Sequence, residues 1–135
     1  MQIELTEKEF RRLLDLVYIG NWVLNSTRGA DRFEDYDHVE SRIFSYCKDH
    51  KMKSLVTEWN GTVVPSKAYA EGGIHEAIMD YEDAIFFDIL AEELARRDME
   101  YVPISAQNYE ELMARMDDYM TEFELHGTDR LQVEE

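Results

Sequence analysis

The stretch IHEAIMDYEDAIFFDILAEELARRD, residues 74–98, decides most of the fold. A glycine pair precedes it and apolar residues recur in it at helical spacing, so we predict one long helix that ends at about its last aspartate. At about 100° per residue, its apolar residues fall on two largely opposite stripes: Ile74, Ile78, Tyr81, Ile85 and Ile89, and Phe86, Phe87, Leu90 and Leu94. Such a helix is either central in its domain or bent between about Asp80 and Asp83.

The carboxylates of this helix form its most distinctive surface. Glu76, Asp80 and Asp83 lie at positions i, i+4 and i+7 and therefore share one face. The later acids are mostly matched by Arg96 and Arg97, which follow them by four residues in the favourable order. We therefore take Glu76, Asp80 and Asp83 as the candidate partner-binding residues. The alternative is that they form only a solvated helix face.

The same carboxylates raise the question of a metal or acid–base site. No glutamate stands three residues before any of the four histidines, and the chain has no H-E-x-x-H, C-x-x-C, calcium-loop, G-x-S-x-G, P-loop or G-x-G-x-x-G pattern. His75 and Glu76 are neighbours in sequence, so their side chains diverge by about 100° on a helix. We expect no cofactor, no metal site and no catalytic residue. A small metal-binding or hydrolytic enzyme with a carboxylate-lined helix is the alternative.

The residues before this stretch predict two more helices. Thr6 and Glu9 have the spacing of a capping box, and the helix they begin contains LVYIGNWVL at 16–24, a run that is apolar nearly all round and typical of a central helix. Asp31 and Glu34 repeat the capping spacing for the second helix. We expect this helix to bury one stripe, formed by Phe33, Tyr36, Val39, Ile43, Tyr46 and Cys47.

Residues 55–65, LVTEWNGTVVP, predict a short β-hairpin, because Asn60-Gly61 between β-branched and aromatic residues favours a type I′ turn. One more helical turn that ends at this pair is the alternative. We expect Trp59 to pack with the hairpin against the helices, although an exposed anchor for a partner would also fit. Cys47 is expected to be a small buried hydrophobic residue.

A fourth helix is predicted to begin near Asn108, which has box-like spacing with Glu111, and to end at Gly127. Its apolar stripe contains Tyr109, Leu112, Met113, Met116, Met120 and Phe123. The prediction is therefore a mainly α fold with about four helices in bundle-like packing and one short hairpin. We expect residues 1–127 to form a single domain and residues 128–135 a frayed tail.

Charge is the feature that departs furthest from an ordinary globular protein. The chain has 14 lysines and arginines against 30 aspartates and glutamates, a formal net charge of −16. Residues 1–67 hold 11 acidic and 10 basic residues, whereas residues 68–135 hold 19 and 4. The negative electrostatic potential of these residues repels phosphate backbones and anionic lipid, so we expect neither direct nucleic-acid binding nor membrane binding.

This charge favours a non-enzymatic interaction module that docks a basic protein partner, as an inhibitor, an immunity-type protein, a DNA mimic or an adaptor does. A structural homo-oligomer, with 16–24 or the methionine-containing stripe at its interface, is the other alternative. The start MQIELTEKEF has no signal-peptide pattern and no run approaches 18 apolar residues, so we expect a cytoplasmic protein.

Two segments carry a resemblance to known proteins. YEDAIFFDILAEELARRD at 81–98, after IGNWVLN at 19–25, resembles small acidic bacterial and phage-borne proteins that have no assigned function. Those proteins carry a similar aromatic helix with a D-x-L-x-x-x-L-A-x-R-D-like pattern. The resemblance covers about a third of the chain. It implies a helical domain of bacterial type, and no functional residue follows from it.

Overall fold

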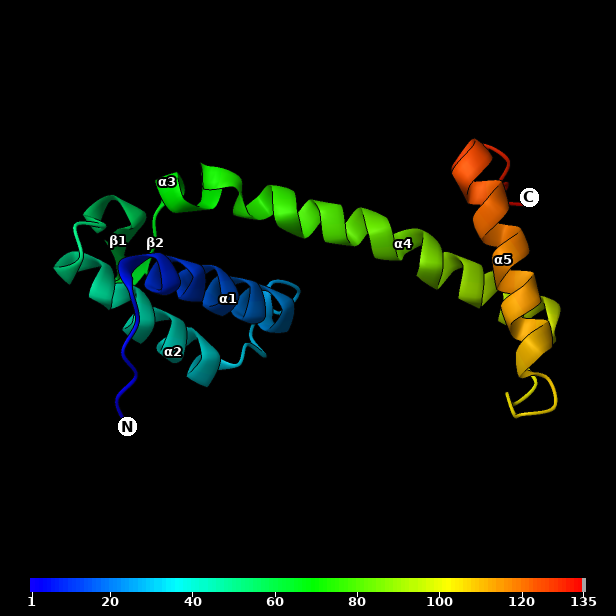
Figure 1. The fold of residues 1–135 in the computed structure, drawn as a ribbon, viewed down its shortest axis with the longest axis horizontal. Helices are drawn as coiled ribbons and strands as arrows, with labels where there is room; N and C mark the ends of the chain where they lie inside the picture. Colours follow the sequence, from blue (N-terminus) through cyan, green and yellow to red (C-terminus); the bar gives the residue numbers. More distant parts are fainter. Residues whose placement is uncertain (135) are drawn as a thin grey trace. The chain divides into compact units, whose positions relative to one another are not determined.

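The computed structural model describes residues 1–134 and is mainly helical, with one two-stranded hairpin (Figure 1). The predicted fold class is therefore confirmed. The four long helices are α1 Glu7–Asn25, α2 Glu34–Ser45, α4 His75–Asp98 and α5 Tyr109–His126. The strands are β1 Val56–Trp59 and β2 Thr62–Pro65. Short helical segments lie between them: η1 Tyr46–Asp49, η2 Lys53–Leu55, α3 Lys67–Tyr69 and η3 Ala70–Ile74.

The chain forms two compact units, Met1–Ile78 and Met79–Glu135, here called unit 1 and unit 2. The boundaries predicted from the sequence, a domain over 1–127 and a tail over 128–135, stay predictions, and Glu135 lies outside the described residues. Within residues 1–134, no helix has the length and apolar character that a bilayer crossing requires.

The first helix begins as its sequence predicts. The Thr6 hydroxyl accepts a hydrogen bond from the Glu9 backbone N–H, and the Glu9 carboxylate accepts one from the Thr6 N–H, each at 3.1 Å. These bonds satisfy two backbone donors that the first turn would otherwise leave free. The expected central position of α1 is wrong, because Leu16 is 70% exposed and Val23 is also exposed. The helix buries one face only, and that face includes two asparagines.

The second helix differs from prediction at its start and along its buried side. Phe33 occupies the N-cap position without a side-chain hydrogen bond, and Asp31 instead binds the Gly29 N–H and Arg28 within the preceding loop. Much of the predicted stripe is exposed, namely Phe33, Tyr36, Val39 and Tyr46. Cys47, a member of that stripe, is buried as predicted, and Phe44, which the prediction left out, is buried as well. The physical reason is that the polar residues of α1 need partners, and α2 turns a polar side toward them.

The hairpin is confirmed and the helical alternative for 55–65 is wrong. Val56 pairs with Pro65 and Trp59 with Thr62, and the turn residues Asn60 and Gly61 have φ angles of 51° and 77°. Val56 packs against the core of unit 1. Trp59 lies three residues farther along the strand and therefore points to the opposite face. It is 68% exposed, so the expected packing of its ring against the helices is wrong.

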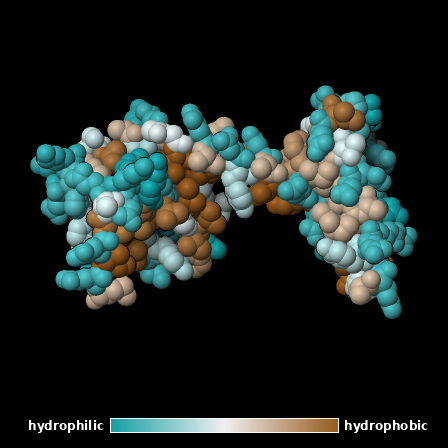
Figure 2. Space-filling model, in the orientation of Figure 1, coloured by the Kyte–Doolittle hydropathy of each residue, from teal (hydrophilic) through white to brown (hydrophobic). Residues whose placement is uncertain are grey.

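The core of unit 1 brings together one side of α1, the end of α2 and the segment before α4. Its buried residues are Phe10, Leu14, Phe44, Cys47, Tyr69 and Ile74. The Cys47 thiol is free and fully buried, as expected, and burial raises its pKa. Figure 2 shows that apolar side chains also remain on the surface of this unit.

Helix α4 runs unbroken from His75 to Asp98, and its bounds match the prediction. The helix does not bend between Asp80 and Asp83. The backbone instead departs from helical geometry just before α4, at Gly73, whose φ is 113°. The two predicted apolar stripes are only partly buried, because Tyr81, Phe86 and Ile89 are exposed. The first stripe supplies buried residues to unit 1 at Ile74 and Ile78, and farther along α4 unit 2 buries Ala91 and Ala95.

Unit 2 is a pair of helices, the second part of α4 and α5, with a small core of Ala95, Met99 and Leu112. The rings of Phe87 and Phe123 add a contact at 5.2 Å between centroids. The capping role predicted for Asn108 is wrong. Its side chain binds the Ser105 N–H and the Pro103 carbonyl of the preceding loop, so it orders that loop instead.

Candidate functional site

The three carboxylates singled out from the sequence lie on the surface of α4. Glu76 belongs to unit 1, and Asp80 and Asp83 belong to unit 2. All three are exposed, and within residues 1–134 none has a side-chain hydrogen bond or ion pair. His75 turns toward α1 rather than toward these carboxylates. The three residues are therefore exposed carboxylates without side-chain partners in the described part of the chain.

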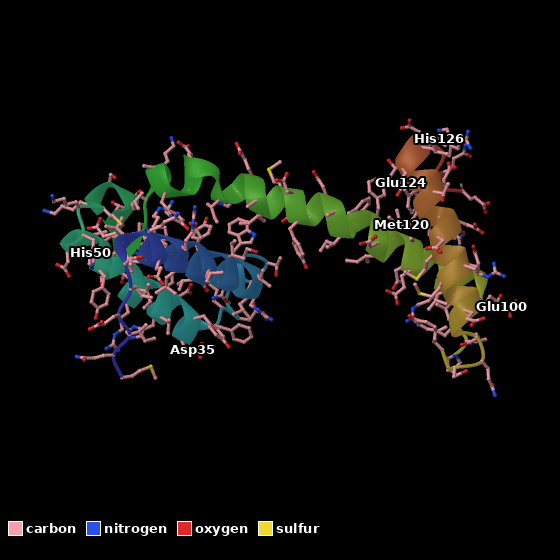
Figure 3. All side chains as sticks on the ribbon, viewed as in Figure 1. Asp35, His50, Glu100, Met120, Glu124 and His126 are labelled. Carbon is pink, nitrogen blue, oxygen red and sulfur yellow. The ribbon has the colours of Figure 1, made fainter. Side chains whose placement is uncertain are left out.

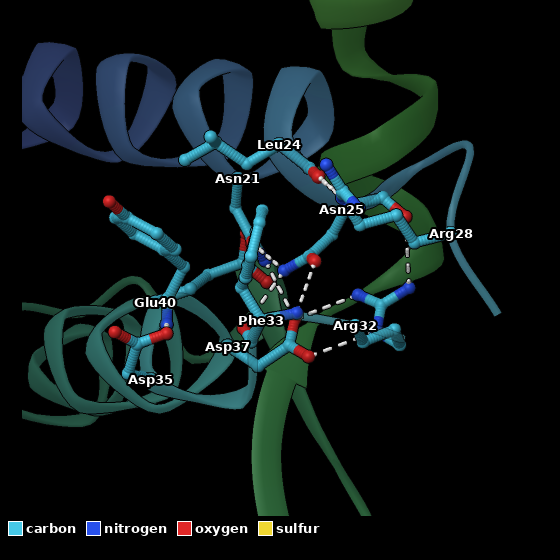
Figure 4. Close-up of polar contacts among 10 residues, drawn as sticks. Asn21, Leu24, Asn25, Arg28, Arg32, Phe33, Asp35, Asp37 and Glu40 are labelled. Atoms are coloured by element: carbon cyan, nitrogen blue, oxygen red, sulfur yellow. Dashed lines mark hydrogen bonds and ion pairs between the residues drawn. The ribbon is translucent and has the colours of Figure 1, made fainter. Parts of the chain in front are cut away.

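A polar network between α1 and α2 is the best-defined arrangement of functional groups in unit 1 (Figure 4). Asn21 and Asn25 are one turn apart on α1 and both are buried. The Asn25 amide donates to Asn21 Oδ1 at 2.7 Å and to the Phe33 carbonyl at 3.1 Å, and Asn25 Oδ1 accepts from the Phe33 N–H at 2.8 Å. Asn25 thus fixes the chain at the start of α2.

Asn21 connects this network to two carboxylates of α2. Its amide nitrogen donates to Asp37 at 2.9 Å and to Glu40 at 3.1 Å. Arg32 binds Asp37 through two nitrogens, at 3.0 and 2.8 Å. The Arg32 hydrogen bond is the main cause that lowers the pKa of Asp37. The guanidinium and the Asp37 carboxylate therefore compensate each other's charge.

Glu40 is the carboxylate of the network that forms no ion pair within residues 1–134, although the charge of Arg32 acts on it. Its carboxylate is half-buried, and this burial raises its pKa against the opposing effect of the Asn21 hydrogen bond. Only Oε2 accepts that bond, and no hydrogen bond from residues 1–134 reaches Oε1. A carboxylate oxygen without a partner in a partly dry place is a strong acceptor for an incoming donor.

An aromatic cluster adjoins the network, with Tyr18 and Trp22 on α1 and His75 at the start of α4. The Tyr18 hydroxyl lies 2.7 Å from His75 Nε2, and the rings of Tyr18 and Trp22 are stacked at 6.2 Å. The Trp22 ring meets His75 edge-on at 4.7 Å. Burial, and then the charge of Glu40, raise the pKa of Tyr18. The Tyr18 hydroxyl and the His75 ring therefore form the polar contact of this cluster.

These two groups enclose a pocket of about 280 Å³, here called the α1–α2 pocket. It is lined by Tyr18, Asn21, Trp22, Ser26, Arg32 and Glu40. The sequence did not predict this pocket, although Tyr18, Asn21 and Trp22 lie in the run 16–24 that was considered as a subunit interface. The available signal was the pair Asn21 and Asn25, four residues apart within an apolar run, because buried amides require hydrogen-bond partners.

Unit 2 presents a second surface of interest, which we name the α4 stripe. Its members share one helix face at i, i+3, i+7, i+10 and i+14, and all are exposed: Met79, Glu82, Phe86, Ile89 and Glu93. Ile89 is 56% exposed. Three apolar side chains and two carboxylates thus share this helix face. This is the pattern that a basic amphipathic segment would complement.

The charge of the chain is concentrated in the same unit. Residues 79–135 hold 17 acidic and 4 basic residues, a net charge of −13, and residues 1–78 hold 13 and 10. The four basic residues of unit 2 are already paired with acids: Arg96 with Glu92, Arg97 with Asp98, Arg115 with Glu111 and Arg130 with Glu122. Glu100 and Glu124 are among the acids that no ion pair within residues 1–134 compensates (Figure 3).

Three histidine, cysteine or carboxylate side chains placed to share a metal ion do not occur among residues 1–134. Comparison with known proteins gives no match to the chain among family models, curated sequences or solved structures. The resemblance of 81–98 to small acidic bacterial and phage-borne proteins therefore stays a prediction.

Proposed function

We propose that the protein is a non-enzymatic, cytoplasmic interaction module that docks a basic protein partner on unit 2. The observation that carries this proposal is the net charge of −13 of residues 79–135, whose basic residues are all occupied by neighbouring acids. An incoming cationic surface would meet carboxylates that have no competing partner. An inhibitor, an immunity-type protein, a DNA mimic or an adaptor would use such a surface.

The partner would contact unit 2 at the α4 stripe. Exposed apolar side chains such as Phe86 and Ile89 lose contact with water when a partner covers them, and this burial supplies affinity. The interspersed Glu82 and Glu93 favour a cationic partner and orient it. Asp80 and Asp83 add charge on the same stretch of α4, and Glu76 stands one turn earlier.

The same charge argues against a second copy of the chain as the occupant, since two units of −13 each would repel each other. It also argues against nucleic acid, because phosphates would meet uncompensated carboxylates. A basic protein segment, helical and apolar along one side, is the occupant that satisfies both the charge and the exposed apolar residues.

The test is capture from lysate of the native host with the immobilised full chain. We expect a basic protein whose retention falls steeply as salt is raised toward about 1 M, where the screening length is about 3 Å. The double variant Met79→Ser, Ile89→Ser should no longer capture this basic protein. The matched control Leu125→Ser removes an apolar side chain that is 71% exposed on α5 and should still capture it.

Circular dichroism establishes that both variants keep their helices, and light scattering gives the mass of the free chain. The proposal is overturned if the captured protein is not basic, if salt leaves its retention unchanged, or if the two variants behave alike. A dimeric mass that the double variant abolishes would instead assign the α4 stripe to a homo-oligomer.

A further inference from the structure

The α1–α2 pocket lies wholly within unit 1, so a ligand bound there would be independent of the partner proposed for unit 2. With a volume of about 280 Å³ the pocket falls just below the usual range of ligand pockets, about 300 to 1,000 Å³. An occupant must therefore be small, or must be a single side chain of a larger molecule. Its chemistry depends on the lining groups that are still free to bind.

Most donors of the pocket are already used within the protein. The Asn21 amide nitrogen serves Asp37 and Glu40, and Arg32 binds Asp37 and the Asn25 carbonyl. An anionic ligand would therefore find few free donors, and it would meet the charge of Glu40. This arrangement disfavours carboxylates and phosphates in the pocket.

Apart from the Ser26 hydroxyl and the Trp22 indole N–H, the free groups of the lining are a carboxylate acceptor and aromatic faces. Glu40 Oε1 has no hydrogen-bond partner within residues 1–134, and Glu40 forms no ion pair there, because the Arg32 guanidinium binds Asp37. Tyr18 and Trp22 add two stacked rings to the lining. A carboxylate beside aromatic rings binds a cation by charge, by hydrogen bonds and by the attraction of the cation to the ring faces.

We propose that the α1–α2 pocket binds an organic ammonium group, with Glu40 as its anionic partner and Trp22 and Tyr18 as its aromatic wall. A free alkylamine and the side chain of a lysine on another molecule present the same group. A metal ion is a poorer occupant, because Glu40 is the only carboxylate of the lining and a metal ion needs several oxygen ligands.

The probe is n-butylammonium chloride, titrated into the full-length Trp59→Phe variant. This variant leaves Trp22 as the single tryptophan, because the chain has two. We expect a saturable change in Trp22 fluorescence, with a dissociation constant in the millimolar range. Sodium n-butyrate, of equal chain length and opposite charge, should cause no saturable change at the same ionic strength.

Glu40→Gln, made in the same background, keeps an acceptor for Asn21 and removes the charge. We expect it to weaken butylammonium binding by at least about tenfold, since a hydrogen bond to a charged group contributes about 1.5–3 kcal/mol. Glu34→Gln changes the net charge equally at an exposed site of the same helix and should leave the affinity within about twofold. Equal effects of the two substitutions would overturn the proposal.

A second variant covers the case in which Glu40→Gln disturbs the fold. Trp22→Leu keeps Glu40 and removes one ring, and butylammonium binding is then followed by ligand-observed NMR. We expect weaker binding than in the wild-type chain.

A capped Ala-Lys-Ala peptide identifies the source of the ammonium. Binding of the peptide points to a lysine side chain, and binding of butylammonium alone points to a free amine. If neither binds at millimolar concentration, the proposal fails.

Discussion

Glu40 carries the clearest consequence of burial for a single residue. Its folded-state pKa is raised above the ordinary value of 4.5, so the folded chain holds this proton more tightly than the unfolded chain does. The stability that this proton contributes is complete below the ordinary pKa and is lost as pH rises through the raised value. Asp37 acts in the opposite sense, because its pKa is lowered and its contribution is lost as pH falls.

The first prediction concerns the pH dependence of Glu40→Gln. The substitution removes the ionisation while keeping an acceptor for Asn21, so we expect the variant to gain stability relative to the wild type as pH rises from about 4 to about 7. Urea unfolding followed by tryptophan fluorescence measures this. Glu34→Gln gives the baseline for loss of one exposed charge. A difference from the wild type that stays constant with pH would contradict the burial of Glu40.

Asn25 is predicted to be the most costly polar residue to truncate. Asn25→Ala leaves the Phe33 N–H and carbonyl without their side-chain partners in a partly buried position. Each unsatisfied backbone group costs about 1–3 kcal/mol, so we expect a loss of about 2–4 kcal/mol in the free energy of unfolding. Thr27→Ala, at an exposed position in the following turn, should change it by less than about 0.5 kcal/mol. Equal losses would show that the network contributes little.

At the scale of the elements, capping signals differ in how well they predict a helix start. The Thr6–Glu9 box is formed, whereas the similar spacing at Asp31 and at Asn108 is not. The reason is local competition, because short polar side chains that precede a helix can bind the loop backbone instead. Asp31 and Asn108 both do so.

The third prediction follows from this difference. Thr6→Ala removes a formed cap and should cost about 1 kcal/mol, with loss of helicity at the start of α1. Asp31→Ala removes no cap and disturbs only exposed loop contacts, with Arg28 and with the Gly29 N–H, so we expect a change below about 0.5 kcal/mol. Chemical unfolding of the two variants, side by side, measures the contrast. A larger loss for Asp31→Ala would mean that the loop controls the start of α2.

Helix positions, the hairpin and the bounds of α4 follow from sequence patterns, because periodicity and turn chemistry are local properties. The faces that are buried do not follow in the same way. The apolar stripe predicted for α2 is largely exposed, because Asn21 and Asn25 of α1 draw the polar side of α2 toward them. The α1–α2 pocket was missed for the same reason. Its residues come from two helices and from the loop between them, and no single-helix pattern reveals their pairing.

At the scale of the whole chain, charge and tryptophan are divided between the units in opposite ways. Unit 2 carries a net charge of −13 and no tryptophan, whereas unit 1 carries both tryptophans and a net charge of −3. Like charges within unit 2 repel one another, and salt screens this repulsion. Added salt should therefore stabilise unit 2 more than unit 1.

Thermal unfolding monitored in two ways tests this last prediction. Tryptophan fluorescence reports unit 1, and circular dichroism at 222 nm reports the helices of both units. We expect the circular dichroism midpoint to rise by several degrees between about 0.01 M and about 1 M sodium chloride, over which the screening length falls from about 30 Å to about 3 Å. The fluorescence midpoint should move much less.

Arg115→Gln removes one of the four compensating charges of unit 2 and should enlarge the salt response of the circular dichroism midpoint. Arg12→Gln, at an exposed position of unit 1, should not enlarge it. Midpoints that shift equally in both signals would mean that the two units unfold as one.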